Sequence, residues 1–158
     1  MSSMVYSFNL NGEKRGLVTP TRGIRQGDPL SPYIFLLVSE DLSSLFKKAM
    51  TNHDISGLKI AKQSPALSHL FFADDTLVFC RANKEEAAHV MNLLKVYEEA
   101  SGQAINAEKS LVFFSKNTGN SVKGEILNIL GGMKEAKQSK YLGLPMVIGR
   151  PKRQVFNY

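Results

Sequence analysis

The first thirty residues alternate between apolar and polar positions and then become rich in turn residues. Residues 4–10, "MVYSFNL", alternate loosely, as a half-buried strand does. Asn11-Gly12 follows, a pair that strongly favours a two-residue hairpin turn. We therefore predict a strand, a turn and a second strand near residues 15–19. Residues 19–32, "TPTRGIRQGDPLSP", are rich in glycine, proline and polar side chains and predict a loop.

A helical period begins after this loop. Ser31 followed by Pro32 is typical of an N-cap and a first helical residue, which predicts a helix over about 32–50. Apolar residues recur in it at roughly helical spacing: Ile34, Leu37, Val38, Leu42 (or Asp41 at that turn), Leu45 and Met50. The segment "NHDISG" ends the period, and "GLKI" after it is a candidate short strand.

Two apolar runs, 67–72 and 76–80, predict strands joined by a tight turn at Ala-Asp-Asp. Asn83 then has the position of an N-cap, with Glu86 placed for a capping box, and Gly102 ends the helix that follows. The apolar face of this helix consists of five residues: Ala87, Val90, Met91, Leu94 and Tyr97.

The remaining pattern predicts a strand at 110–115, a short helix at 121–130 and a strand-like segment at 141–148. Strands and helices alternate without a βαβ repeat, so the expected class is α+β. The 158 residues fit one domain with a modest core.

Composition limits the partners and the cell compartment that we expect for the protein. Lysine and arginine exceed aspartate and glutamate by 20 to 14, and the formal net charge of +6 suits a polyanionic partner or simply a solvated basic surface. Cys80 is the single cysteine, which excludes an internal disulfide and a cysteine zinc cluster. No apolar run has the length of a membrane span or the form of a signal peptide. We expect an intracellular, non-secreted protein, with nucleus and cytoplasm both compatible and no membrane partner.

Asp74 and Asp75 are the main chemical question, because two ionised carboxylates repel each other and lose hydration when apolar strands flank them. Three arrangements resolve this conflict: an exposed turn, a basic partner, or a bound divalent cation such as Mg²⁺, which prefers carboxylate oxygen. Aspartate is also common in ordinary turns.

Three further segments carry candidate binding residues. In "RGIRQGDPLSP", Arg22 and Arg25 can hold phosphate and Gln26 can bind a base or sugar, although an ordinary helix-capping loop has the same composition. In "SGQAINAEKS", Lys109 is either a phosphate ligand or a solvated lysine. The segment "SKYLGLP", 139–145, reads as a strand ending in a turn.

Taken in order, "RQGDPLSPYIF", "HLFFADDTLVF", "SGQAINAEKS" and "YLGLP" resemble successive blocks of a reverse transcriptase, most closely the non-LTR (LINE-type) kind found in plants. The resemblance implies a partial palm with part of the fingers, an antiparallel sheet packed on helices. It makes 1–158 one partial domain, with a palm core at about 17–116 and the start of a primer-support segment at about 139–158.

The same resemblance implies RNA-directed DNA polymerase chemistry, a nucleotidyl transfer that uses two Mg²⁺ ions, an RNA template, a DNA primer and dNTPs. Asp74 and Asp75 match the metal-binding pair, and Lys109 matches a lysine proposed as general acid toward pyrophosphate. The residues implied to contact nucleotide and template are Arg25, Gln26, Gly27, Asp28, Pro29, Phe72 and Ala73. Those implied to support the primer are Tyr141, Leu142 and Gly143.

The sequence departs from the family pattern at one place. The family carries another aspartate on a strand before the "RQGDPLSP" loop, whereas here the residues before that loop contain Glu13 as their single acid. We therefore expect a fragment that needs further reverse transcriptase segments and is inactive alone. The alternatives are a catalytically dead nucleic-acid-binding remnant, a relic without function, and a reverse transcriptase like those of group II intron maturases.

Overall fold

The computed structural model describes residues 5–20, 23–25, 27–136, 140–141 and 144–145. Within them helices and short strands mix, which agrees with the expected α+β class and is compatible with a partial reverse transcriptase domain. The expected single antiparallel sheet is not what the described strands form. They make four separate two-stranded sheets, of which three are antiparallel and one is parallel.

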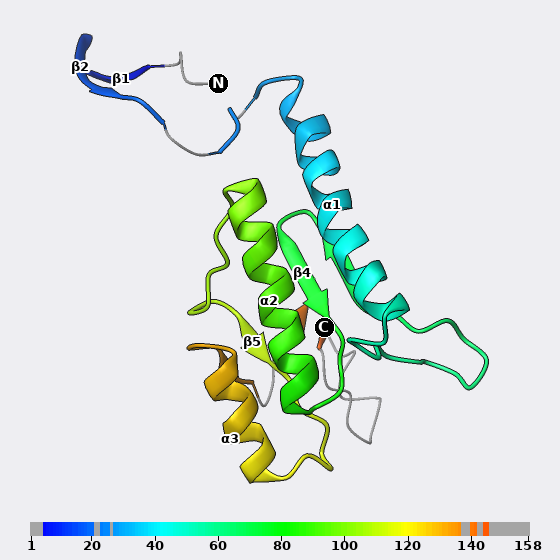
Figure 1. Ribbon diagram of the computed structural model, residues 1–158. Coiled ribbons are helices and arrows are strands. Elements are labelled where there is room, and N and C mark those ends of the chain that lie inside the picture. The colour runs from blue at the N-terminus through cyan, green and yellow to red at the C-terminus, as the bar shows by residue number, and fades with distance from the viewer. Residues whose placement is uncertain (1–4, 21–22, 26, 137–139, 142–143, 146–158) are drawn as a thin grey trace.

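The N-terminal hairpin joins β1 (Tyr6–Leu10) to β2 (Glu13–Val18), as the Asn-Gly signal predicts. Asn11 and Gly12 both have positive φ, 53° and 89°, which is the backbone of a type I′ turn. Every residue of both strands is exposed, and Figure 1 shows the hairpin apart from the helices. Its pairing therefore rests on the turn and on the two strands alone.

Helix α1 (Ser31–Thr51) begins one residue earlier than expected. Its N-cap is Leu30, without a side-chain hydrogen bond, so the prediction of Ser31 as N-cap is wrong. The buried stripe is Leu42, Ser43, Phe46 and Ala49, while Leu37 is 70% exposed. The amino-terminal half of the helix thus projects beyond the core, and only its carboxyl-terminal half is packed.

The second hairpin pairs β3 (His69–Phe72) with β4 (Asp75–Val78) and lies between α1 and α2 in Figure 1. Phe71 and Val78 pack against the main core, Val78 at the base of the hairpin and Phe71 one pair before the turn. The predicted "GLKI" strand is reduced to a single bridge between Leu58 and Leu67.

Helix α2 (Lys84–Ser101) has the ends that the sequence predicts. Asn83 caps it by accepting a hydrogen bond from the Glu86 N–H at 2.7 Å, and Gly102 ends it in a left-handed conformation. The reciprocal half of the capping box is absent. The Glu86 carboxylate accepts hydrogen bonds from the Ser56 N–H and hydroxyl and from the Arg81 N–H, at 2.7–2.9 Å. Glu86 therefore joins the two segments that enter and leave the β3–β4 hairpin.

The carboxyl-terminal elements are short. They are β5 (Leu111–Val112), α3 (Asn120–Ile129), β6 (Lys134–Glu135), β7 (Lys140–Tyr141) and β8 (Leu144–Pro145). The strand predicted over 110–115 keeps only two residues, because β6, which the pattern did not reveal, pairs with it in parallel over two residues. The predicted helix at 121–130 is α3, displaced by one residue.

Two buried clusters form the core, and α2 contributes to both. The larger cluster joins α1 and α2 through Leu42, Phe46, Ala49, Ile55, Val90, Leu94 and Tyr97. The smaller one joins α2 to α3 and the segment after it through Ala87, Ile126 and Leu130. No helix in the described part of the chain is long and apolar enough to cross a bilayer.

Candidate active site

The turn between β3 and β4 carries the aspartate pair. Ala73 and Asp74 form the two-residue turn, and Asp75 is the first residue of β4, paired with Phe72 across the hairpin. Ala73 has a positive φ of 50°, a conformation that costs a residue with a Cβ about 1 kcal/mol or more. The aspartates therefore stand at a tight tip rather than in a flexible loop.

Both aspartates are exposed, and neither carboxylate has a hydrogen bond or ion pair to the described residues. Of the three arrangements that the sequence left open, the protein itself adopts the exposed turn. Water solvates the carboxylates there, so folding does not require a cation to neutralise them. The same exposure leaves four carboxylate oxygens available to a cation or to a ligand.

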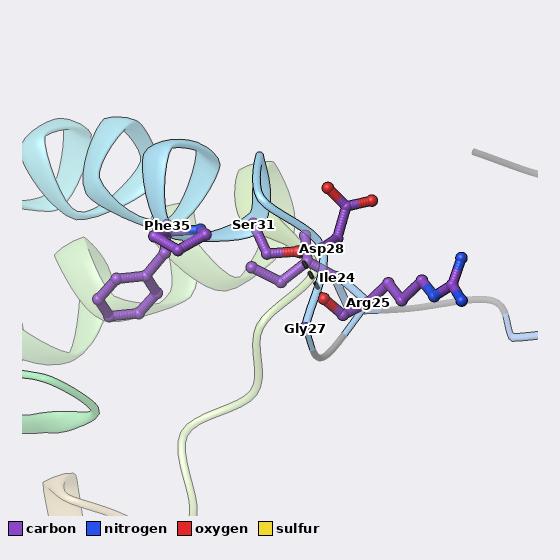
Figure 2. Close-up of a pocket in the computed structure, with 7 residues that line it drawn as sticks. Ile24, Arg25, Gly27, Asp28, Ser31 and Phe35 are labelled. Atoms are coloured by element: carbon purple, nitrogen blue, oxygen red, sulfur yellow. Dashed lines mark hydrogen bonds between the residues drawn. The ribbon is translucent and has the colours of Figure 1, made fainter.

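The "RGIRQGDPLSP" loop is organised around Asp28. Its Oδ1 accepts the Leu30 N–H at 2.8 Å, and its carbonyl accepts the Ser31 N–H at 3.0 Å. The Ser31 hydroxyl donates in turn to the Arg25 carbonyl at 2.6 Å (Figure 2). Gly27 has a positive φ of 80°, which the turn needs. Asp28 therefore fixes the loop before α1, and this role explains why Ser31 is not the cap.

An open cavity of about 470 Å³ lies against this loop. Its lining consists of Ile24, Arg25, Gly27, Asp28, Ser31, Pro32 and Phe35. Figure 2 shows the Arg25 side chain extending away from Phe35, and Arg25 is exposed with no ion pair to the described residues. The cavity combines an apolar wall with a free guanidinium, a combination that suits a ligand with a flat apolar part and an anionic part.

A second cavity, of about 240 Å³, connects this region to the hairpin. It is lined by Phe35, Leu36, Ser39, Glu40, Ser43, Phe71 and Ala73. Phe35 is common to both cavities, and Ala73 is the first residue of the aspartate turn. The loop predicted to contact nucleotide and the hairpin predicted to bind metal therefore adjoin the same half of α1, although 45 positions separate Asp28 from Ala73 in the chain.

A hydrogen-bonded histidine, whose role the sequence did not reveal, lies at the base of this hairpin. The His69 ring lies near Phe46 and Phe71, with centroid distances of 5.3 and 4.7 Å. Its two nitrogens lie 3.0 Å from the Ser43 hydroxyl and 2.8 Å from the Ser68 hydroxyl. Burial, and then the charge of Lys47, hold the pKa of His69 below its usual range, so the ring is neutral at pH 7. The only sequence signal was a histidine at the start of an apolar strand.

The remaining predicted residues are not brought to the hairpin tip by any contact in the described part of the chain. Lys109 is exposed in a turn, where its N–H donates to the side-chain and main-chain oxygens of Asn106. Tyr141 lies on β7, paired with Leu144. Gln26, Leu142 and Gly143 lie outside the described residues.

The aspartate pair fits part of a magnesium site. Mg²⁺ takes one or two protein carboxylates and completes its shell with water and substrate phosphates. A two-metal site needs more carboxylate oxygens, and the residues that the structure describes include no group of three histidine, cysteine, aspartate or glutamate side chains able to hold an ion. The described residues would supply part of such a site and not all of it.

Comparison with known proteins gives the family to which the chain belongs. The family model described as reverse transcriptase (RNA-dependent DNA polymerase) matches residues 1–146, and the chain belongs to this family. An uncharacterized mitochondrial protein of Arabidopsis thaliana is 52% identical over 69 residues, which are 44% of this chain and 57% of that protein. The match thus spans little more than half of that relative's length. No solved structure matches the chain.

Proposed function

We propose that this chain is part of an RNA-directed DNA polymerase of a LINE-type retroelement, and that it contributes the palm segment with the aspartate hairpin. The family match supports the polymerase class. The order of the four sequence blocks supports the LINE-type assignment, and the similarity to a protein of a plant supports the plant-like one. The chain would act inside the cell, in the nucleus or the cytoplasm.

One observation carries the proposal: two exposed carboxylates, with no hydrogen bond or ion pair to the described residues, stand at a tight hairpin tip near the "RGIRQGDPLSP" loop. Ala73 of this tip lines one cavity, the loop lines another, and Phe35 of α1 belongs to both. In this proposal Asp74 and Asp75 are ligands for Mg²⁺, which would supply charge stabilisation for phosphoryl transfer when bound. Phe72, 59% exposed beside the turn, and Ala73 would face the primer end.

The loop would hold the incoming nucleotide. Arg25 offers phosphate a guanidinium that has no ion pair to the described residues, and Phe35 offers an apolar wall. Gly27 lets the backbone approach the ligand closely, and Asp28 keeps the loop in one conformation through its hydrogen bond to Leu30. Gln26, Pro29 and Lys109, and the primer-support residues Tyr141, Leu142 and Gly143, keep the roles that the family resemblance implies.

We further propose that residues 1–158 alone do not polymerise. The described residues gather no third acidic ligand near the pair, and the lack of one bridging carboxylate should lower the rate on the order of 10³-fold or more. An acidic residue from another reverse transcriptase segment would complete the site.

The test is binding of an RNA template annealed to a DNA primer, measured by anisotropy with and without Mg²⁺ and a complementary dNTP. The proposal predicts that Mg²⁺ plus dNTP tightens binding and that Asp74→Asn removes this gain, while primer extension stays undetectable. Salt-sensitive binding that ignores Mg²⁺ and survives Asp74→Asn would instead identify a nucleic-acid-binding remnant. Extension that Asp74→Asn abolishes would show a site complete within residues 1–158.

A further inference from the structure

The β3–β4 hairpin has only a small anchored base. It consists of two four-residue strands and a two-residue turn, and a hairpin of this size has little stability by itself. His69 and Val78 pair at the base, and Phe71 packs on the core one pair before the turn, whereas Phe72 and the aspartates at the tip are exposed. The direction in which the tip points therefore depends on how β3 is held against α1, through Phe71 and through His69.

His69 is the residue that connects this base to α1. Its Nε2 meets the Ser43 hydroxyl on α1, and its Nδ1 meets the Ser68 hydroxyl beside the strand. Ser43 and Ser68 are 7% and 4% exposed, so water does not replace these bonds. The ring also stacks on Phe46, which is fully buried on α1. Among common side chains, only imidazole provides two opposed nitrogens and a flat ring at once.

A small rotation at this base is amplified at the tip. The turn lies four residues from His69, which at about 3.3 Å per residue is roughly 13 Å of strand. A rotation of about 5° would then move the tip by roughly 1 Å, a displacement that in an active site can lower a rate about 10²-fold. Ser43 and Ala73 line the same cavity, so the residue that His69 contacts on α1 belongs to the wall that reaches the tip.

We propose that His69 is a positioning residue: through Ser43 it fixes the aspartate tip against the amino-terminal half of α1. Its relevance to catalysis rests on the proposed function, but the geometry can be tested without it. The charged groups that act on the His69 ring are Lys47 and Glu40. Both lie on α1 and form an ion pair at 3.2 Å.

The experiment uses residues 1–158 with a nitroxide spin label at the tip. Cys80 is the single cysteine and is exposed, so Cys80→Ala with Asp74→Cys gives one labelling site. The paramagnetic broadening of amide signals in α1 then reports the distance and mobility of the tip. In the parent we expect strong broadening at Leu36, Ser39 and Glu40, which line the cavity beside Ala73.

The test variants are Ser43→Ala, His69→Phe and His69→Gln. The control for His69→Gln is His89→Gln, which makes the same substitution at an exposed histidine of α2. We expect the α1 broadening to fall to less than half in Ser43→Ala, His69→Phe and His69→Gln, and to stay unchanged in His89→Gln. If His69→Phe does not fold, Ser43→Ala, which removes one hydroxyl, still decides the question.

The double variant Ser43→Ala with His69→Phe separates positioning from stability. It removes the orphaned Ser43 hydroxyl and should regain part of the lost stability, yet the tip should stay displaced. Broadening that recovers together with stability, or that never changes in the single variants, would overturn the proposal. The spin-label measurement needs no metal, and Mg²⁺ binding is measured on the unlabelled parent, which keeps Asp74. A tip that is positioned in the labelled chain, with no Mg²⁺ binding in the parent, would count against the proposed function alone.

Discussion

The two hairpins of this chain are built alike and held differently. Both have a two-residue turn whose first residue has positive φ, Asn11 in one and Ala73 in the other. The β1–β2 hairpin is exposed along its whole length, whereas β3–β4 packs its base on the buried core and projects its tip. Turn chemistry makes a hairpin, but only tertiary anchoring gives it a fixed place relative to other site residues.

The largest contrast should appear when one phenylalanine is removed from each region. Phe46 lies on α1, is fully buried and stacks on His69. Phe46→Ala should therefore lower the free energy of unfolding by about 3–5 kcal/mol. Phe8 on β1 is 61% exposed, and Phe8→Ala should stay within about 0.5 kcal/mol. Urea denaturation of both variants checks this, and equal losses would show that the first hairpin has an anchor too.

The next contrast uses Glu86, which holds both segments flanking β3–β4. Burial alone would raise the pKa of Glu86, but hydrogen bonds from Ser56 and from the Arg81 N–H outweigh burial and lower it. A lowered carboxyl pKa gives stability that is present above the ordinary glutamate value of about 4.3 and is lost as the pH falls through the folded-state pKa.

Glu86→Gln should therefore cost about 1–3 kcal/mol at pH 7 and flatten the fall in stability below about pH 4.5. Glu85→Gln, one residue earlier and exposed, is the control. Denaturation at several pH values measures both. An acid profile that keeps its slope in Glu86→Gln would assign the acid loss to other groups, such as His69, whose lowered pKa removes stability as the pH falls below about 6.5.

At the two turns we expect smaller changes in stability, and of opposite sign. Gly12 has a φ of 89°, so Gly12→Ala should destabilise the first hairpin, by about 1 kcal/mol. Ala73→Gly relieves a positive φ of 50° but adds freedom to the unfolded chain, and should stabilise by about 0.5 kcal/mol or less. Amide exchange across each hairpin measures them, and a loss in Ala73→Gly would mean that Ala73 is not strained.

Much of the local structure was predictable from the sequence. Asn83 and Gly102 bounded α2 correctly because capping and left-handed termination are decided by neighbouring residues. Asn11-Gly12 and the Ala-Asp-Asp turn were found for the same reason. The predicted helix start at residue 32, with Ser31 as N-cap, was wrong by one residue, because the Asp28 carboxylate ties the loop in a way that spacing does not reveal.

What depends on distant partners could not be predicted. Strands β5 and β6 pair over two residues each, although α3 separates them in the sequence, and no periodicity in the sequence marks this pair. Glu86 looked like a capping-box residue, but its carboxylate binds Ser56, 30 positions away. The exposure of Asp74 and Asp75 also depended on tertiary structure, because Phe71 and Val78 on either side of them pack on the core while residues 72–76 do not. Their roles as metal ligands, like those of Lys109 and the loop residues, remain predictions.

The most direct test of the central claim is the response of the amide spectrum of residues 1–158 to Mn²⁺, used as a paramagnetic substitute for Mg²⁺. The account predicts that Mn²⁺ broadens Ala73, Asp74 and Asp75 first, that Mg²⁺ competes, and that Asp74→Asn abolishes the effect. Because Asp74 is exposed and has no partner among the described residues, this variant should change stability by less than about 0.5 kcal/mol. Broadening elsewhere, or tip broadening that survives Asp74→Asn, would contradict the account.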